Sequence, residues 1–313
     1  MTCCYLIQSH NDPAQVLRLV ETIKRSSPGA EVLVVHDARQ QPLDPAPFEK
    51  LPGVEVLVRR ERVARGELSV LSPMFAGIEH LLESKGGRPR SDFDWLVYLS
   101  GQDYPTRPLK DFEDSLATTK HQGFLTFWDV EGERTPWRPR QARDRYFAQY
   151  RRLPDWTLRP LSAVRFLGKI TPLRFHLHYG PFVGWRMRKT PFGEPFRCYG
   201  GWQWWTLSRP CVEYLRDFMA SRPEIVGWFS RTMAPCESLV PTILANSGRF
   251  DLFPDNRRFV DFAGSRDGRP RTLHREDLPL IARGEFDFAR KFDVAEDSEI
   301  LDLLDREVLT LTP

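Results

Sequence analysis

The sequence has few cysteines and no long hydrophobic run. Its five cysteines form no C-x-x-C pair and have no companion histidine at the spacing of a zinc site, so we expect buried, reduced thiols. The amino terminus lacks a basic segment, its apolar run from Cys3 to Ile7 is short, and no run approaches the length of a membrane span. These absences predict a cytoplasmic protein of bacterial type.

A strong overall charge is also missing, because the 313 residues carry a net charge of only +3. The distribution is nevertheless uneven: residues 138–189 contain thirteen Lys or Arg and two acids, a net +11, which leaves −8 for the rest of the chain. Over residues 131–195 hydrophobic periodicity fails, and Arg, Pro and aromatic residues alternate. We predict here a basic, aromatic insertion made of functional or mobile loops.

Two interpretations of this insertion stay open. It would suit an anionic partner: an anionic glycan, a phosphate-bearing acceptor, or the inner face of an anionic membrane, to which the protein would be peripheral. It would equally suit an ordinary solvated surface. Nucleic acid is not an expected partner.

The rest of the chain alternates short apolar runs with helical patterns. Buried-type strands are predicted at residues 3–7, 32–35, 54–58, 95–99 and 124–128, with helices after the first, third and fourth of them. Asp12, Pro13 and Gln15 predict an N-cap, a first-turn proline and a capping-box glutamine for the first helix. This order predicts an α/β fold with a mostly parallel central sheet flanked by helices.

Ligands of such folds bind beyond the carboxyl ends of the strands. His10, His36 and Asp37 follow the first two strands, so we expect them near a nucleotide. Asp103 follows the fourth strand in a compact turn. Its carboxylate is expected either to point into the crevice or only to bond local backbone N–H groups.

Two glycines precede three tryptophans in the segment 198–208. This pattern predicts a backbone brought close to a ligand, with Gln203 and Trp204 near a sugar. Core packing is the alternative for the indoles.

Residues 234–248 predict a helix that begins at Pro235 and carries Glu237 in its first turn. Unpaired N–H groups and the helix dipole would hold that carboxylate ionised, so it could accept a proton from a bound hydroxyl. Acidic residues are common in any first turn, which makes a purely structural role the alternative. Pro241 lacks the N–H that this helix would need, so the helix begins later or bends.

In chain order, these segments resemble glycosyltransferase family 14, the core-2/I-branching β-1,6-N-acetylglucosaminyltransferases and the related peptide O-xylosyltransferases. The resemblance is carried by residues 9–13, 99–105, 201–205, 235–238, 258–262 and 288–293. Each motif is weak alone, but the ordered set spans almost the whole chain. It implies a single GT-A-like nucleotide-sugar transferase domain. Its expected parts are a nucleotide-binding half (1–130), the basic insertion (131–195) and an acceptor and catalytic half (196–313).

The resemblance also implies an activity: inverting transfer of a sugar, GlcNAc or xylose, from a UDP-sugar to a hydroxyl of a glycan acceptor. Glu237 stands at the position of the family's general base. Lys291 matches the late lysine, and either Arg269 or Arg271 is the basic partner on the diphosphate. No metal and no other cofactor is expected, with Mn²⁺ or Mg²⁺ as the alternative.

Three departures from the family pattern limit what is carried over. The one Asp-x-Asp near a strand, Asp92 to Asp94, precedes the fourth strand and therefore lies at the wrong end of the sheet for a donor site. Cys236 replaces the aspartate that usually precedes the base. Asp261 stands where the animal enzymes carry an aromatic residue and is kept as a sugar-site candidate. The competing function is a carbohydrate- or polyanion-binding protein built on a degenerate transferase fold.

Overall fold

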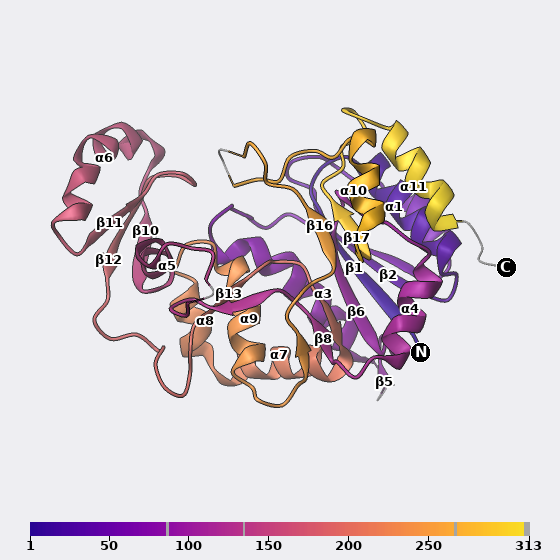
Figure 1. Cartoon of the computed structure of the whole chain (residues 1–313), viewed down its shortest axis with the longest axis horizontal. Coiled ribbons are helices and arrows are strands. Elements are labelled where there is room, and N and C mark those ends of the chain that lie inside the picture. Colours follow the sequence, from indigo (N-terminus) through magenta and orange to yellow (C-terminus); the bar gives the residue numbers. More distant parts are fainter. Residues whose placement is uncertain (86–87, 134, 266–267, 310–313) are drawn as a thin grey trace.

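The computed structural model describes residues 1–85, 88–133, 135–265 and 268–309. Its centre is a seven-stranded sheet in the order β15-β8-β14-β6-β1-β2-β3 (Figure 1). The strands are β1 (Cys3–Ser9), β2 (Glu31–Asp37), β3 (Val54–Arg59), β6 (Trp95–Ser100), β8 (Gly123–Phe124), β14 (Thr206–Ser208) and β15 (Leu252–Phe253). β1, β2, β3 and β6 run parallel, and β14 is antiparallel to both of its neighbours. The expected α/β class with a mostly parallel central sheet is confirmed.

Helices cover both faces of this sheet, because alternate residues of its strands point to opposite sides. Cys3, Tyr5 and Ile7 belong to one hydrophobic core and Cys4 and Leu6 to the other. The first core packs against α1 (Pro13–Ser26), α2 (Ala46–Glu49), α4 (Leu109–Thr118), α10 (Leu278–Arg283) and α11 (Glu299–Leu309). The second packs against α3 (Ser72–Leu82), α7 (Arg209–Ser221), α8 (Pro223–Phe229) and α9 (Leu239–Ala245).

The first helix begins as predicted, but Gln15 does not have the capping role expected of it. Asp12 caps α1 by accepting the N–H of Gln15 at 3.0 Å. The Gln15 side chain forms no capping box. It is buried, donates to the carbonyls of Gly101 and Phe292, and accepts the N–H of Val294. It thus joins α1 to the segments that follow β6 and β17 at the carboxyl edge of the sheet.

A small second sheet brings the end of the chain to that same edge. It consists of β16 (Arg258–Val260), β17 (Phe288–Arg290) and β7 (Asp103–Pro105), with Arg290 opposite Asp103. The strand predicted at 124–128 is split into β8 and β9 (Phe127–Asp129), and β9 pairs with β13 (Tyr199–Gly201). A Cβ on Gly201 would lie 2.0 Å from the carbonyl oxygen of Thr126, so only glycine fits this crossing.

The basic insertion is ordered, which corrects the prediction of loops. It contains α5 (Pro139–Tyr146), α6 (Leu158–Val164) and an antiparallel sheet in the order β10-β12-β11, formed by β10 (Ala148–Arg152), β11 (Leu173–His176) and β12 (Phe182–Arg186). Hydrophobic periodicity is not visible there because these elements are short. Asp144 of α5 forms ion pairs with both Arg174 and Arg186. Residues 148–189 project at one end of the molecule (Figure 1), and we call them the basic lobe.

The remaining short elements are η1 (Leu68–Leu71), η2 (Asp155–Thr157), η3 (Arg165–Lys169), η4 (Pro235–Glu237), η5 (Arg275–Asp277), β4 (Ser84–Lys85) and β5 (Arg88–Pro89). None of the helices in the described residues combines the length and the apolar character that crossing a membrane requires.

Candidate active site

A cleft of about 590 Å³ opens at the carboxyl ends of β1, β6, β16 and β17. This is the edge at which ligands of open α/β sheets bind. Seven of the residues predicted for the site line it: His10, Asp37, Gln203, Trp204, Glu237, Arg269 and Lys291. The other four, His36, Asp103, Asp261 and Arg271, lie outside its lining.

Glu237 reaches the cleft from a different local structure than predicted. It ends the 3-10 turn η4, and α9 begins only at Leu239. The helix therefore starts later than Pro235, and the missing N–H of Pro241 falls in its first turn, where no intrahelical partner is needed. With seven residues, α9 is short, so its dipole is not the main influence on this carboxylate.

The main influence is Arg145 in α5, which sequence reasoning did not single out. Its Nη1 donates to Oε2 of Glu237 at 2.5 Å, across 92 residues of chain. The guanidinium lies 4.7 Å above the ring of Trp137, which fixes its position. Burial opposes the charge on Arg145, but the carboxylate of Glu237 outweighs it and the pKa of Arg145 is raised. Among the described residues, no hydrogen-bond donor is found on Oε1 of Glu237.

The residue before the base candidate is a neutral thiol. Burial, and after it the charge of Glu237, raises the pKa of Cys236 to about 12. Cys236 therefore cannot replace the aspartate in orienting Glu237, and Arg145 occupies the neighbouring space.

Lys291 and Arg269, the two basic residues predicted for the diphosphate, both line the cleft. Lys291 directly follows β17, and its carbonyl accepts the N–H of Leu273. Arg269 lines the same cleft as His10, which follows β1. Burial, and after it the charges of His36 and Arg269, lower the pKa of His10. Lys291 and Arg269 are thus two of the four basic residues that line the cleft, with Arg65 and Arg290.

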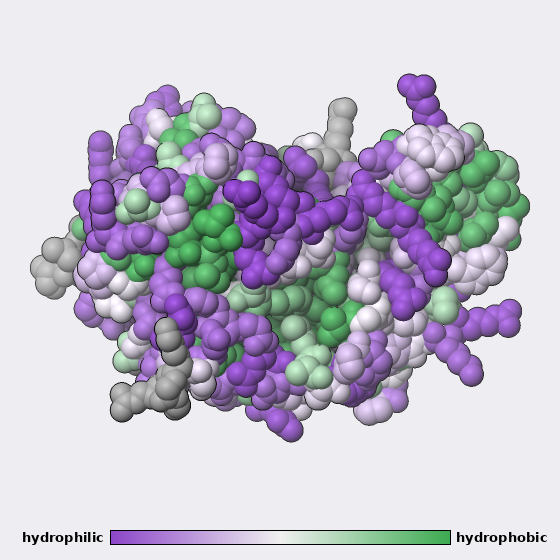
Figure 2. Space-filling view, turned by 180° about the vertical axis from the view of Figure 1, so that it is seen from behind, coloured by the Kyte–Doolittle hydropathy of each residue, from purple (hydrophilic) through white to green (hydrophobic). Residues whose placement is uncertain are grey.

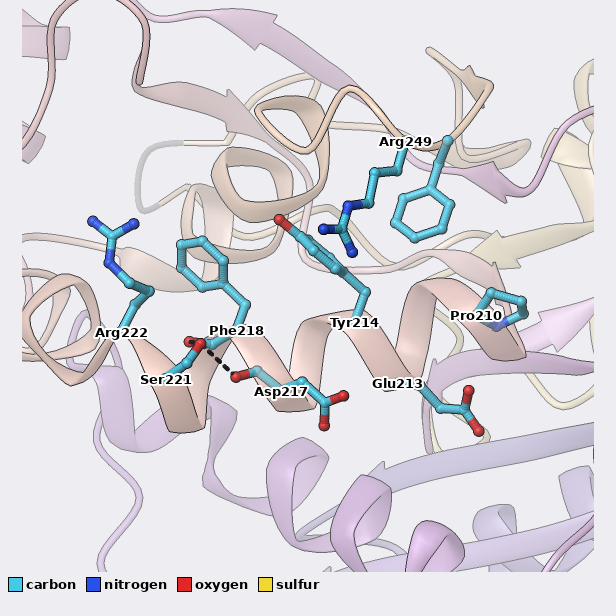
Figure 3. A pocket seen from close by; sticks show the side chains of 9 residues that line it. Pro210, Glu213, Tyr214, Asp217, Phe218, Ser221, Arg222 and Arg249 are labelled. Carbon is cyan, nitrogen blue, oxygen red and sulfur yellow. Dashed lines mark hydrogen bonds between the residues drawn. The ribbon is translucent and has the colours of Figure 1, made fainter.

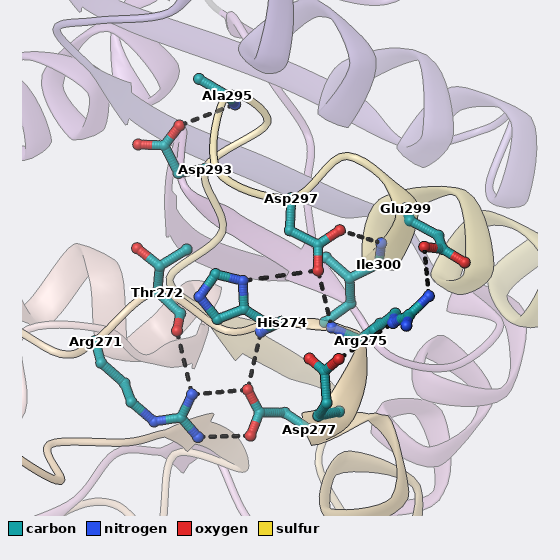
Figure 4. Close-up of polar contacts among 11 residues, drawn as sticks. Arg271, Thr272, His274, Arg275, Asp277, Asp293, Ala295, Asp297, Glu299 and Ile300 are labelled. Carbon is teal, nitrogen blue, oxygen red and sulfur yellow. Dashed lines mark hydrogen bonds and ion pairs between the residues drawn. The ribbon is translucent and has the colours of Figure 1, made fainter.

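Arg271, the alternative to Arg269, is engaged by carboxylates outside the cleft (Figure 4). Its guanidinium forms a two-point ion pair with Asp277, at 2.5 and 2.8 Å, and its Nε donates to Asp261 at 2.6 Å. The bonds to Arg271 hold the pKa of Asp277 below its usual value. The pKa of Asp261 is lowered first by the backbone N–H of Ala263 and then by Arg271. The structure thus joins two of the predicted site residues, Asp261 and Arg271, to each other.

Asp103 is buried beneath the cleft. It accepts hydrogen bonds from the backbone N–H and the hydroxyl of Ser100 and forms an ion pair with Arg290 at 3.2 Å. Arg290 in turn lies 4.4 Å above the ring of Trp204 and lines the cleft. Desolvation by burial lowers the pKa of Arg290, which makes a buried acid partner necessary.

The three tryptophans of the segment 198–208 differ in how exposed they are. Trp205 is fully buried in the core, and Trp204 is 8% exposed under Arg290. Trp202, which was not singled out, is 37% exposed, stacks on Phe262 at 5.1 Å and lines the cleft. It is therefore the indole of this segment with an accessible face.

Of the two candidates at the end of β2, Asp37 lines the cleft and His36 does not. Two-point hydrogen bonds with Arg39 hold the pKa of Asp37 below the usual value. His36 is fully buried between the hydroxyl of Ser9, at 2.8 Å, and the carbonyl of Gln41, at 2.7 Å. Its contacts are those of a satisfied core histidine.

Sequence reasoning also missed Arg65 and Tyr179, which line the cleft together. Arg65 lies 5.0 Å from the centre of the Tyr179 ring. No local signal marks either residue, because one follows β3 and the other lies between β11 and β12 of the basic lobe.

Among the described residues, no group of three or more His, Cys, Asp or Glu is arranged to hold a metal ion. Asp92 and Asp94 lie at the amino end of β6, opposite the cleft. Asp94 accepts the backbone N–H of Thr2, and Asp92 lies 3.8 Å from Arg209.

A second hollow lies along the outer side of α7 (Figure 3). Its rings already pair with cations: Arg249 covers Tyr214 at 5.1 Å and Arg222 covers Phe218 at 5.7 Å. It is far from the carboxyl ends of the strands, so we do not assign it a catalytic role.

Curated relatives share the sequence at a low level. The chain is 24% identical over 262 residues to rat xylosyltransferase 2, covering 77% of this chain and 26% of that protein. It is 24% identical over 266 residues to the beta-glucuronosyltransferase GlcAT14B of Arabidopsis thaliana, covering 84% of this chain and 54% of that one. The chain thus spans about a quarter to a half of the length of these relatives.

Among solved structures, the S. aureus protein TarS in complex with UDP-GlcNAc resembles the chain at a TM-score of 0.30 and 14% identity, over 44% of this chain and 37% of that one. A likeness this low does not bear on function. The family described as "Core-2/I-Branching enzyme" matches residues 4–281. The resemblance drawn from the ordered motifs is therefore confirmed, and the chain belongs to the core-2/I-branching enzyme family.

Proposed function

We propose that this chain is an inverting, metal-independent glycosyltransferase that moves a sugar from a UDP-sugar to a hydroxyl of a glycan acceptor. The observation that carries the proposal is the composition of one cleft, which combines Glu237, Lys291 and Arg269 at the carboxyl edge of the sheet. The transfer needs a base on the acceptor side and positive charge on the departing diphosphate, and this cleft supplies both.

Glu237 acts as the general base. Arg145 holds Oε2, which leaves Oε1 to accept the proton of the attacking hydroxyl. Arg145 is a positioning residue in this scheme, because it acts through Glu237. A fixed carboxylate is favourable, since proton transfer requires heavy atoms within roughly 2.6 to 3.2 Å.

Lys291 and Arg269 stabilise the diphosphate as its bond to the sugar breaks. A lysine supplies a point charge and an arginine two parallel N–H groups, and both suit phosphate oxygens. Arg271 is not assigned this role, because Asp277 and Asp261 engage its guanidinium. Trp202 offers an aromatic face to a sugar ring, with Gln203 and Trp204 beside it.

The donor sugar is proposed as GlcNAc or xylose, the two sugars of the family resemblance. Calorimetry with a panel of UDP-sugars in EDTA tests the site. We expect one UDP-sugar to bind without metal, and Lys291→Ala and Arg269→Ala each to weaken it about tenfold or more. Arg275→Ala, an exposed arginine outside the cleft, serves as the matched control and should leave binding unchanged.

Binding that requires Mn²⁺ or Mg²⁺ would refute metal independence. Failure of every UDP-sugar to bind, with or without metal, would refute the proposal and favour a carbohydrate- or polyanion-binding protein on this fold.

A further inference from the structure

Large apolar side chains are exposed mainly in the basic lobe. Of the eleven large hydrophobic residues that are exposed among the described residues, seven fall within positions 156–187. They are Trp156, Leu158, Val164, Phe166, Ile170, Trp185 and Met187. Figure 2 shows apolar surface gathered over this end of the molecule, at the right of the view. Such a concentration in one small lobe marks an interaction surface.

The elements of the lobe explain why these side chains stay uncovered. No residue of α6 is buried, although the helix carries Leu158, Leu161 and Val164. Trp156 and Ile170, on either side of it, are each 77% exposed. A helix normally buries an apolar stripe against its own domain, and this one does not.

Basic side chains accompany the apolar ones. Residues 148–189 contain nine Lys or Arg and one acid, a net +8, against +3 for the whole chain. Six of these cations are exposed, and within the described part of the chain five of the six have no carboxylate partner. These five are Arg151, Arg159, Arg165, Arg188 and Lys189. The single acid, Asp155, pairs with Arg152.

This combination points to one kind of partner. Tryptophan and aliphatic side chains enter the interface of a bilayer, while neighbouring arginines meet anionic headgroups. A second copy of the lobe would bring +8 against +8, so self-association is disfavoured. Nucleic acid would match the charge but not the exposed Ile170 and Leu158.

We propose that the basic lobe docks the protein on an anionic lipid surface. Trp156, Phe166 and Ile170 enter the headgroup region, and the unpaired cations contact lipid phosphates. Because Tyr179 of the same lobe lines the cleft, docking places the cleft beside the membrane. The proposal does not depend on the chemistry proposed for the cleft.

Flotation of the full chain with vesicles tests this. At low salt we expect binding to vesicles of phosphatidylcholine and phosphatidylglycerol in equal amounts, little binding to phosphatidylcholine alone, and release by high salt. The double variant Trp156→Ser with Ile170→Ser should reduce partitioning about tenfold or more. Arg159→Gln and Arg165→Gln should each reduce it about fivefold, the effect of roughly 1 kcal/mol per basic residue at such a surface.

A matched control lies at the opposite end of the molecule in Figure 1, on α10. Leu280→Ser with Arg283→Gln removes one exposed apolar and one exposed basic residue there, and should leave partitioning unchanged. Absence of binding to anionic vesicles at low salt overturns the proposal, as does equal loss in the α10 variant. So does light scattering that shows a dimer dissociated by the lobe variants, because the surface would then bind a second copy.

Discussion

The central sheet and the basic lobe differ in where their apolar side chains lie. Every residue from Cys3 to Ile7 is at most 2% exposed, because helices cover both faces of the sheet. In the three-stranded sheet of the lobe, Ala148, Tyr150 and Phe182 are buried in a small cluster, whereas Trp185 is 51% exposed. Apolar content alone therefore does not identify a core. In one region it supports the fold, and in the other it remains available to a partner.

The largest difference between the two regions is expected in the free energy of unfolding when one tryptophan of each region is replaced. Trp205→Ala removes a fully buried ring beside Tyr98 and should lower the free energy of unfolding by about 3 to 5 kcal/mol. Trp156→Ala removes a ring that is 77% exposed and should change it by about 0.5 kcal/mol or less. Urea unfolding measures both. Equal losses of unfolding free energy in the two variants would contradict the assignment of Trp205 to the core and Trp156 to the exposed surface.

A smaller effect is expected from Asp144 of α5, which forms ion pairs with two arginines of the lobe. Asp144 accepts ion pairs from Arg174 at 2.5 Å and from Arg186 at 2.7 Å, and Arg174 is largely buried. Asp144→Asn leaves these guanidinium groups without their counter-charge, and should cost roughly 2 kcal/mol of local stability.

Hydrogen exchange of residues 148–186 measures this loss of local stability. The amides of β1 and β2 should stay protected from exchange. Asp155→Asn is the matched control, because its ion pair with Arg152 is solvent-exposed and contributes about 0 to 1 kcal/mol. Uniformly faster exchange across the whole chain would show that the lobe is not a separate unit of stability.

The smallest of the three effects depends on pH. Burial, and after it the charge of Arg145, lowers the pKa of His176 from 6.5 to about 4. In the unfolded chain this histidine takes up a proton near pH 6.5, so its contribution to stability is complete above that pH and declines as the pH falls toward 4. A shift of this size corresponds to at most about 3 kcal/mol, and we expect the lobe to lose part of this between these pH values.

The same hydrogen-exchange signal, followed from pH 7 to pH 4.5, reports this loss. His176→Phe keeps an aromatic ring but cannot take up a proton, so it should flatten the pH dependence of the lobe. A variant as acid-sensitive as the wild type would assign the effect to another group.

The two regions also differ in what the sequence alone could predict. Continuous apolar runs and capping residues such as Asp12 placed the strands and helices of the first half well. These signals are local. The pair of Glu237 and Arg145 joins positions 92 residues apart, and Arg145 was one of thirteen basic residues in a segment without periodicity. The choice between Arg269 and Arg271 likewise depended on Asp277 and Asp261, whose contacts follow only from the folded turn.

The ordered motifs identified the family correctly because they follow the strand ends that meet at the cleft. They could not identify Trp202 as the accessible indole, since neighbouring tryptophans look alike in sequence. The difference appears only in the folded chain, where Trp202 stacks on Phe262 and stays 37% exposed while Trp204 is buried beneath Arg290.

Glu237→Gln tests the central claim most directly, by comparing transfer rate and donor binding in the same variant. With Glu237 as the base, transfer from the bound UDP-sugar should fall by about 10² to 10⁴-fold while the affinity for that UDP-sugar is unchanged. Glu276→Gln is the control, since Glu276 also lies in a 3-10 turn before a short helix but outside the cleft. A Glu237→Gln enzyme that transfers sugar at the wild-type rate would contradict the account.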